Sequence, residues 1–566
     1  MKRSILIVMA LALVVAMPLG SVYALETFKG PTEINQYNPD KAYNGYTMFT
    51  PNMSPTSPYK TYLIDMWGNV VHTWSSQYGV GLYARLLPNG SLLRGATVPA
   101  ANAADTYGVL SGPRCGGFEE YDWDGNVTWQ YFHYSEDSIS HHDFRRIWNK
   151  QLGAYTTIFL TFERMTPQNA IDWGCDPKYV DDYTNNGNGW SCDGIYEVDM
   201  NGNIVWKWTF ADHLCQDYDP TKPNFGVISE MPEKLNINWE TPYGGPRTDW
   251  THCNSLDYHE DLGHICVNAK HTSEFYVIDH DGTFVAGNPA ASIAAAASDA
   301  GDFLYRFGNP SVYDQGEPAA FHTEGNQQMY ASHDIQWIGG TNAPWDASEL
   351  PGGGNFLIFD NGTWCTLFAH SEILEINPFV LDATGTKSAS YVNPPDAGYT
   401  WQAAIGGVGA DGCNLSNQVQ WRFQSQVPTS FFGSFVSSCQ RLPNGNTLID
   451  SGPTGHFFEV TANKEVVWEY QNPVGITGIA TSLTDAAGGM FFYTFRCHRY
   501  GPDYSGLAGR KLESQGTITG RIPTLSGGGD VWPETITYTG WGAAALSGEG
   551  GGGDAGGGGG GGGGGY

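Results

Sequence analysis

Basic residues are scarce in this chain of 566 residues, which has 28 Lys and Arg against 58 Asp and Glu and a formal net charge of -30. A surface with this excess of negative charge repels polyanions, so the composition excludes nucleic acid as a partner. The charge indicates solubility rather than a docking patch.

The ten cysteines include no C-x-x-C pair, the spacing typical of structural zinc sites. Disulfides are the other common use of cysteine, and they form outside the cytosol. Sequence does not fix their pairing, but Cys175 with Cys192 and Cys253 with Cys266 are near enough in the chain to be expected pairs.

Beyond its first residues the chain has no apolar run long enough to span a membrane. Residues 1–24 carry Lys2 and Arg3, then an apolar stretch from Ile5 to Met17 and small residues, the pattern of a secretory signal peptide. An uncleaved anchor is the alternative. We therefore expect an exported protein, periplasmic or extracellular.

Helical periodicity is also scarce, whereas Gly is abundant. Residues 526–566 are nearly pure glycine towards the end, and such a segment cannot bury a core. We predict a disordered tail there and strands between residues 25 and 525.

A repeated hairpin pattern fills that middle region. Each copy alternates apolar residues, turns mostly on Asp, Asn or Gly, and continues with β-branched and aromatic residues, which is the pattern of a β-hairpin. Four copies are continuous and two are split by insertions. They are Thr61–Trp74, Phe118–Tyr131, Ile195–Trp208, Phe457–Tyr470, Phe275–Gly282 with Phe303–Phe307, and Ile373–Ile376 with Val419–Phe423.

Six such units predict an all-β fold, a six-bladed β-propeller over residues 25–525. A further hairpin with a P-N-G turn occurs at Pro88–Gly90 and again at Pro443–Gly445, so each blade should have four antiparallel strands. Irregular spacing with long insertions favours a propeller over a solenoid, because blade loops open to solvent. The recurring turn residues Asp122, Asp199 and Asp279 are interpreted as turn formers rather than calcium ligands.

Histidines recur at one position of the repeat, just before an expected innermost strand. The sequence reads S-H-H-D at 140–143, D-W-T-H at 249–252 and A-S-H-D at 331–334. Equivalent positions of successive blades face the central channel, so His142, His252 and His333 should converge on one pocket. Two alternatives stay open: a blade-to-blade hydrogen-bonding device made by the H-D pairs, and a metal ion held by the three histidines.

The motifs together resemble the bacterial aryl-sulfate sulfotransferase family. They are D-W-T-H-C-N-S, S-H-D-I-Q-W followed by N-F-L-I-F-D-N-G, and Q-R-L-P-N-G-N-T-L-I, and the resemblance covers most of residues 59–506. It implies a six-bladed periplasmic propeller that moves a sulfuryl group from a phenolic sulfate ester to a phenol through a sulfated histidine. It implies no nucleotide sulfate donor and no cofactor, and it matches His252 and His333 to histidines that contact the sulfate.

Two positions depart from that family. Glu372 stands where the family has an arginine, and a carboxylate would repel a sulfate ester. Ser438 stands at the expected phase of the histidine that becomes sulfated. The chain is therefore either a divergent transferase whose nucleophile is open, or a non-catalytic binding or scaffold propeller.

Imidazole is a good nucleophile near neutral pH, and guanidinium forks suit oxyanions. The residues predicted to be catalytic are His252, His333, His142 and His498. Those predicted to bind substrate are Arg496, Arg499 and His370. A further histidine, His456, is a candidate nucleophile or anion clamp, and the alternative is that it faces solvent, because it lies inside a hairpin repeat. No resident metal is predicted. Donor, acceptor and oligomeric state are not specified by the sequence.

Overall fold

The structure is a computed structural model, and the residues that it describes are 32–52, 54, 57–97, 115–180, 190–240, 249–316, 326–363, 369–382, 384–401, 414–480 and 492–521. The predicted signal peptide, residues 1–24, and the predicted tail, residues 526–566, lie outside the described residues.

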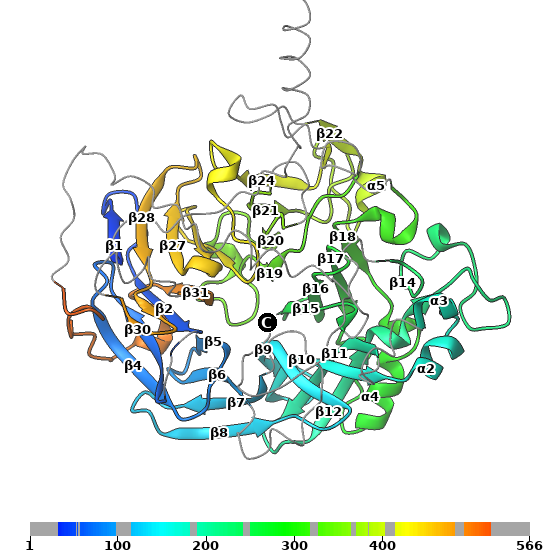
Figure 1. Cartoon of the computed structure of the whole chain (residues 1–566), viewed down its shortest axis with the longest axis horizontal. Coiled ribbons are helices and arrows are strands. Elements are labelled where there is room, and N and C mark those ends of the chain that lie inside the picture. Colours follow the sequence, from blue (N-terminus) through cyan, green and yellow to red (C-terminus); the bar gives the residue numbers. More distant parts are fainter. Residues whose placement is uncertain are drawn as a thin grey trace, which may run out of the picture.

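The described residues form six antiparallel sheets arranged as blades around a ring, as Figure 1 shows. All six repeats found in the sequence are the two outer strands of a blade, so the predicted six-bladed β-propeller is confirmed. From the innermost strand outwards, three blades are β31 (Thr494–Tyr500), β2 (Tyr46–Pro51), β3 (Tyr59–Ile64), β4 (Val70–Ser76); β5 (Val80–Leu86), β6 (Leu92–Thr97), β7 (Gly116–Tyr121), β8 (Val127–Phe132); and β9 (Ser138–Asn149), β10 (Ala154–Met165), β11 (Trp190–Asp199), β12 (Ile204–Thr209). The other three are β15 (Cys253–His259), β16 (His264–Ala269), β17 (Glu274–Asp279), β18 (Tyr305–Phe307); β19 (His333–Trp337), β20 (Phe356–Asp360), β21 (Glu372–Ile376), β24 (Val419–Phe423); and β25 (Ser438–Arg441), β26 (Thr447–Ser451), β27 (His456–Val460), β28 (Val466–Gln471).

Both ends of the described chain close the ring. The C-terminal strand β31 pairs with β2, with Tyr46 opposite Tyr500, and so supplies the innermost strand of the first blade. The N-terminal strand β1 (Glu33–Tyr37) pairs with β28 as a fifth strand of the last blade, with Glu33 opposite Gln471. Closure removes the open sheet edges that would otherwise be left unpaired.

Tryptophans on the outermost strands tie neighbouring blades together. Their indole N–H groups donate to the outer turn of the next blade, as Trp74 does to the Asp122 carbonyl at 3.1 Å and Trp468 to the Met66 carbonyl at 2.9 Å. The other indoles of this kind are those of Trp129, Trp206 and Trp421. Because a buried indole N–H needs an acceptor, each bond fixes how one blade meets the next.

The aspartates in the outer turns bond their own turn. The carboxylates of Asp122 and Asp199 accept from the backbone N–H and side-chain amide of the Asn four residues later, at 2.8 to 3.0 Å. The Asp279 carboxylate accepts from the Gly282 N–H at 2.7 Å. These contacts agree with the interpretation of the three residues as turn formers.

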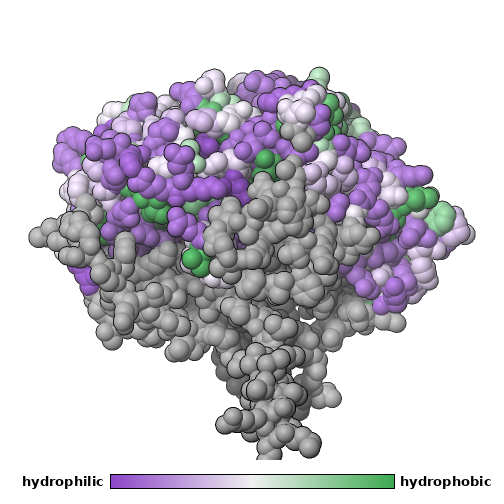
Figure 2. All heavy atoms as spheres, turned by 90° about the horizontal axis from the view of Figure 1, so that it is seen from above, coloured by the Kyte–Doolittle hydropathy of each residue, from purple (hydrophilic) through white to green (hydrophobic). Residues whose placement is uncertain are grey.

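Insertions between strands carry the few helices and small sheets. Their bounds are α2 (Pro167–Asp172), α3 (Pro177–Val180), α4 (Pro289–Ala296), α5 (Pro394–Ala397), β13 (Leu214–Cys215) with β14 (Leu235–Asn236), β22 (Tyr399–Trp401) with β23 (Asn414–Ser416), and β29 (Val474–Gly475) with β30 (Gly478–Ile479). None of the helices in the described ranges has both the length and the apolar character needed to cross a membrane. The rim seen in Figure 2 is mostly hydrophilic where residues are described, with scattered hydrophobic side chains.

The expected disulfides are wrong for the described residues. Cys253 pairs in register with Ala269 and Cys266 with Asp257, so the two thiols lie at opposite ends of the β15–β16 hairpin. Both are free, and so is Cys192, which rules out its pairing with Cys175 here. Nearness in sequence misled the prediction, because a hairpin separates residues at its two ends by the length of its strands.

Candidate functional site

The three histidines predicted to converge do meet at the centre of the ring. The rings of His142 and His252 lie 5.0 Å apart between centroids, and Phe495 of β31 lies 6.0 Å from His142 and 6.4 Å from His333. In Figure 1 the strands β9 and β19, which contain His142 and His333, and β15, which begins one residue after His252, lie near the middle of the ring. All three side chains are almost fully buried.

Local backbone irregularities aim these side chains. His142 and His252 adopt positive φ angles of 45° and 48°, and Asp334, next to His333, has a φ of 58°. The β9–β10, β15–β16 and β19–β20 ladders each shift register at these points. A β-bulge bends the strand and turns a side chain out of the regular alternation, and such strain is typical of functional positions.

Hydrogen bonds fix the tautomers of two of the histidines. His252 Nδ1 lies 2.5 Å from Asp249 Oδ2, and a carboxylate only accepts, so Nδ1 carries the proton. His333 Nδ1 lies 2.6 Å from Asn361 Oδ1, and the Asn361 amide nitrogen donates to the Gly433 carbonyl at 2.6 Å, which identifies Oδ1 as the acceptor. In both rings Nε2 therefore holds a lone pair when the ring is neutral.

His142 is oriented by its neighbour in the sequence. His142 Nδ1 lies 2.7 Å from His141 Nδ1, and His141 Nε2 lies 2.8 Å from Asp193 Oδ1. The ring of His141 stacks on Phe162 at 3.7 Å between centroids, and both histidines are buried. The Asp193 carboxylate favours a proton on His141 Nε2, so His141 Nδ1 accepts from His142 and the Nε2 lone pair of His142 is left exposed to the pocket.

The surroundings keep this trio neutral. Burial holds the pKa of His142 and of His252 well below the ordinary value, and lowers that of His333 to about 3. The next largest causes are His141 for His142, and Lys270 for both His252 and His333. At neutral pH the pocket therefore presents uncharged imidazoles beside a lysine, and burial lowers the pKa of that lysine as well.

Lys270 and its neighbours add a cation and a set of possible metal ligands to the pocket, and the sequence patterns did not predict them. Asp249, His252 and His271 offer ligand atoms within 4.8 Å of one another, a spacing that could suit a metal ion. This set shares only His252 with the trio that the sequence suggested. Lys270 adds positive charge next to it, which favours an anion over a cation at this point.

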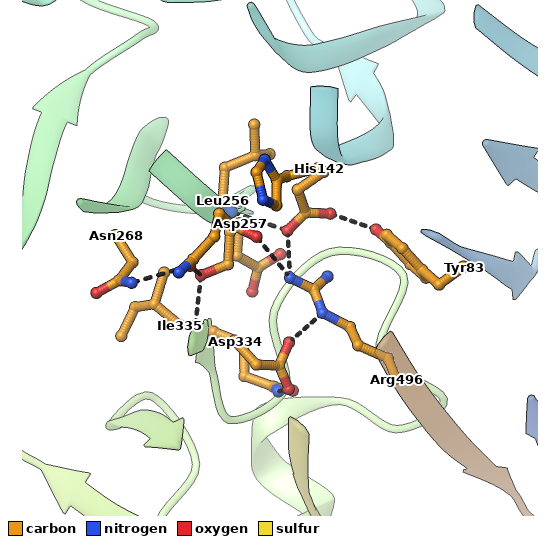
Figure 3. A network of polar contacts seen from close by, with 12 residues as sticks. Tyr83, His142, Leu256, Asp257, Asn268, Asp334, Ile335 and Arg496 are labelled. Atoms are coloured by element: carbon orange, nitrogen blue, oxygen red, sulfur yellow. Dashed lines mark hydrogen bonds and ion pairs between the residues drawn. The ribbon is translucent and has the colours of Figure 1, made fainter. Parts of the chain in front are cut away.

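The aspartates of the H-D pairs form ion pairs with arginines, whereas the histidines line the pocket. Arg496 forms ion pairs with Asp143 Oδ2 and Asp334 Oδ1, both at 2.8 Å, at the centre of the network in Figure 3. Arg145 Nη1 donates to Asp143 Oδ1 at 2.5 Å, and Tyr83 donates to the same oxygen. Although burial alone would raise the pKa of Asp143, the two guanidinium groups hold it well below the ordinary value.

The same acidic residues join β9 to β15 and β19 to β25. The Leu256 N–H donates to Asp143 Oδ2 at 2.8 Å, and the Cys439 N–H donates to Asp334 Oδ2 at 3.0 Å. Ser255 accepts in the same way from the Ile335 N–H at 2.9 Å. The predicted blade-to-blade device therefore exists, but it uses the aspartates, while the preceding histidines line the pocket.

These bonds also locate the sixth blade's equivalent position. Ser438 Oγ accepts from the Cys497 N–H at 3.3 Å, as Asp334 accepts from Cys439. Ser438 is thus the counterpart of Asp334, and Ser437 is the counterpart of His142 and His333. The expected phase was wrong by one residue, but a serine occupies the position in either case.

Arg496 and His498, two of the other predicted site residues, lie on β31 facing the channel. The guanidinium of Arg496 forms ion pairs with two carboxylates through Nη2 and Nε, while its Nη1 has no hydrogen-bond partner among the described residues. Arg496 also helps to lower the pKa of His333, and its role as a clamp for a substrate anion stays a prediction. His498 lies two residues further along, beside Arg85 and Arg145, and burial followed by these charges lowers its pKa. None of the histidine trio is among the groups that act on it.

Arg499, His370 and His456 lie away from the trio. Arg499 stacks over Trp468 at 4.6 Å and donates to Thr47 at 2.7 Å, so it joins the last blade to the first. His370 Nε2 lies 2.8 Å from Glu372 Oε1. The alternative that His456 faces solvent is wrong, because it is 2% exposed and bonds Glu469 at 2.7 Å.

Glu372 does not present an uncompensated charge. Arg422 donates to it from Nε at 2.7 Å and from Nη2, and burial, which would raise its pKa, is outweighed by Arg422 and His370. The expected repulsion of a sulfate ester is therefore cancelled within blade five.

A cavity of about 970 Å³ lies towards the opposite ends of the innermost strands. It is lined by residues that follow the innermost strands, among them Trp148, His259 and Gly340. The histidines stand at the starts of the same strands, so this cavity is separate from the candidate site.

Comparisons with known proteins support the resemblance seen in the sequence. The family model Arylsulfotransferase (ASST) matches residues 176–369, a stretch that contains His252, Lys270 and His333. This match supports an arylsulfotransferase-type domain over residues 176–369. No curated protein matches.

Solved structures add little to this assignment. A protein of unknown function from Bacteroides caccae shares 10% identity over 77% of this chain and 97% of its own, with a TM-score of 0.35. A periplasmic gluconolactonase from Pseudomonas aeruginosa shares 10% over 75% and 96%, with a TM-score of 0.30. Scores at this level carry no argument about function.

Proposed function

We propose that this protein transfers a sulfuryl group from a phenolic sulfate ester to a phenol through a histidine intermediate, without a nucleotide sulfate donor. We also propose that it acts after export, in the periplasm or outside the cell, in keeping with the signal peptide predicted in residues 1–24.

The observation that carries the proposal is the pairing of neutral imidazoles with a neighbouring cation. A sulfate monoester is an anion, so Lys270 would attract it, and an imidazole lone pair at Nε2 could attack its sulfur. Because the histidines stay neutral at pH 7, this lone pair is available under ordinary conditions.

Four residues of the pocket have distinct roles in this reaction. His252 and His333, held by Asp249 and Asn361, contact the sulfuryl group, and Lys270 offsets its negative charge. Phe495, beside two of the rings, excludes water and offers an aromatic surface to the aryl group.

The test is release of p-nitrophenol from p-nitrophenyl sulfate by the purified mature protein, with phenol as acceptor. We expect acceptor-dependent release, and a loss of about 10²-fold or more in kcat/KM for His252→Ala and His333→Ala. His456→Gln is the matched control, because it removes an equally buried histidine outside the site and should keep full activity.

A second candidate function is an anion-binding propeller without turnover. The serines at positions 437 and 438 favour it, since the sixth blade supplies no histidine to the centre. In that case p-nitrophenyl sulfate would bind, Lys270→Ala would weaken its binding, and no p-nitrophenol would be released by a folded sample over several phenols.

A further inference from the structure

The sixth blade has Ser437, not a histidine, just before its innermost strand β25, whereas the third blade supplies His142 at the equivalent place. His142 occupies on β9 the position that Ser437 occupies before β25, as the matching blade-to-blade bonds of Asp143 and Ser438 show. A central nucleophile can therefore come from the third blade instead of the sixth.

The groups behind the three imidazoles differ. An amide oxygen of Asn361 faces His333, and Asp249 faces His252. Behind His142 stands a second imidazole, His141, with Asp193 2.8 Å beyond it. An amide can only orient a ring, whereas an imidazole backed by a carboxylate can take up a proton.

Positive charge is distributed unevenly over the pocket. Lys270 is the largest cause after burial for the lowered pKa of His252 and of His333, but the weakest of those acting on His142. Its backbone N–H donates to the His252 carbonyl at 3.2 Å, which fixes it on that side. The anion is thus drawn towards Lys270, His252 and His333, and the ring of His142 lies 5.0 Å from that of His252 between centroids, within reach of the same anion.

We propose that His142 is the nucleophile that carries the sulfuryl group, with His141 and Asp193 as positioning residues that take up its proton. This inference rests on the proposed function and deepens it by naming the residue that forms the covalent intermediate.

The step balances as follows. The Nε2 lone pair of His142 forms a bond to sulfur as the bond from sulfur to the aryl oxygen breaks, and the electron pair leaves with the phenolate. The Nδ1 proton of His142 passes to His141 Nδ1, and the resulting imidazolium is stabilised by Asp193. Lys270 gives a proton to the phenolate. In the second half-reaction the acceptor phenol returns a proton to Lys270 and attacks sulfur, the Nε2–sulfur bond breaks, and the His141 proton returns to His142.

The decisive measurement is a single turnover of p-nitrophenyl sulfate without acceptor. We expect a burst of one p-nitrophenol per protein molecule, and a peptide containing His142 that gains one sulfur trioxide unit by mass. His142→Ala should abolish both, and added imidazole should restore part of the release by replacing the missing ring. His142→Gln provides a second variant should the alanine variant fold poorly.

Asp193 needs a measurement that a structural role would not change. We expect Asp193→Asn to slow the burst about 10²-fold while leaving the inhibition constant of inorganic sulfate unchanged. Asp199→Asn, in the exposed turn at the end of the same strand β11, is the matched control and should leave the burst intact.

The outcomes separate the two proposals. A wild-type burst that persists in both His142 variants, or a sulfated peptide without His142, overturns the nucleophile but keeps the transferase. If the wild-type protein releases no p-nitrophenol with or without phenol, the proposed function fails and this inference fails with it. A burst slowed equally by Asp199→Asn would overturn the positioning role of Asp193.

Discussion

The outer hairpins and the starts of the innermost strands use the same residue types in opposite ways. On the outside, His280 lies between Glu197 at 2.9 Å and Asp281 at 2.8 Å, and these carboxylates outweigh burial and raise its pKa to about 9. In the centre, burial and neighbouring positive charge lower the pKa of His333 to about 3. A buried histidine is thus a charged structural link in one region and a neutral chemical group in the other.

Aspartates show the same contrast. In the outer turns Asp122 bonds its own backbone and lies at the surface, so it acts within one hairpin. In the centre Asp143 joins Arg145, Arg496 and the next blade, and it is fully buried. The repeated sequence therefore determines the local structure of the outer turns, whereas the arrangement of side chains at the centre depends on contacts between blades.

Among the substitutions that compare central with outer residues, we expect Asp143→Ala to lower the free energy of unfolding most. Asp143→Ala leaves the buried Arg145 and Arg496 without their shared carboxylate, so we expect a loss of about 3–5 kcal/mol in the free energy of unfolding. Urea denaturation measures it. Asp122→Ala, the matched change in an outer turn, should have a much smaller effect, because the Asp122 side chain lies at the surface and bonds its own turn. Equal losses for the two variants would contradict the contrast.

A smaller effect, dependent on pH, is expected at His280. Its pKa is about 9 in the folded protein and near 6.5 in the unfolded chain, so its contribution is full below pH 6.5 and is lost as pH rises through about 9. The difference in unfolding free energy between wild type and His280→Gln should therefore shrink by up to about 3 kcal/mol between pH 6 and pH 10. A difference that stays constant over this range would show that the link is not ionic.

The smallest effect is expected at the outer tryptophans. Trp206→Phe keeps most of the buried ring but removes the indole N–H that donates to Thr283 Oγ1 at 3.0 Å. We expect a loss of about 1 kcal/mol in the free energy of unfolding, with sulfuryl transfer unchanged. A loss of activity similar to that of His252→Ala, measured on folded protein, would show that the outer ring also shapes the site.

The sequence was most informative where contacts are local. The hairpin copy at Ile195–Trp208 became β11 and β12 because alternation and turn residues act within a few positions of the chain. The same alternation could have shown that Arg499 points away from the channel, since it is one residue from His498 on β31. The two consecutive histidines at 141 and 142 were also visible in the sequence. The role of His141 depends on its contact with Asp193, which lies on β11 of the same blade, 52 positions later in the chain.

By itself the sequence determined the number of blades, their four-strand plan and the convergence of His142, His252 and His333. The blades follow from a repeat, and a repeat placed in a ring brings equivalent residues such as His142 and His333 together. His252 stands two residues before Asn254, the equivalent position of the fourth blade, and still reaches the centre. Contacts in the tertiary structure determine which ring nitrogen carries the proton, place Lys270 beside the trio, and pair Arg496 with two carboxylates. Such properties are set by burial and by charges from other blades, which sequence separation does not reveal.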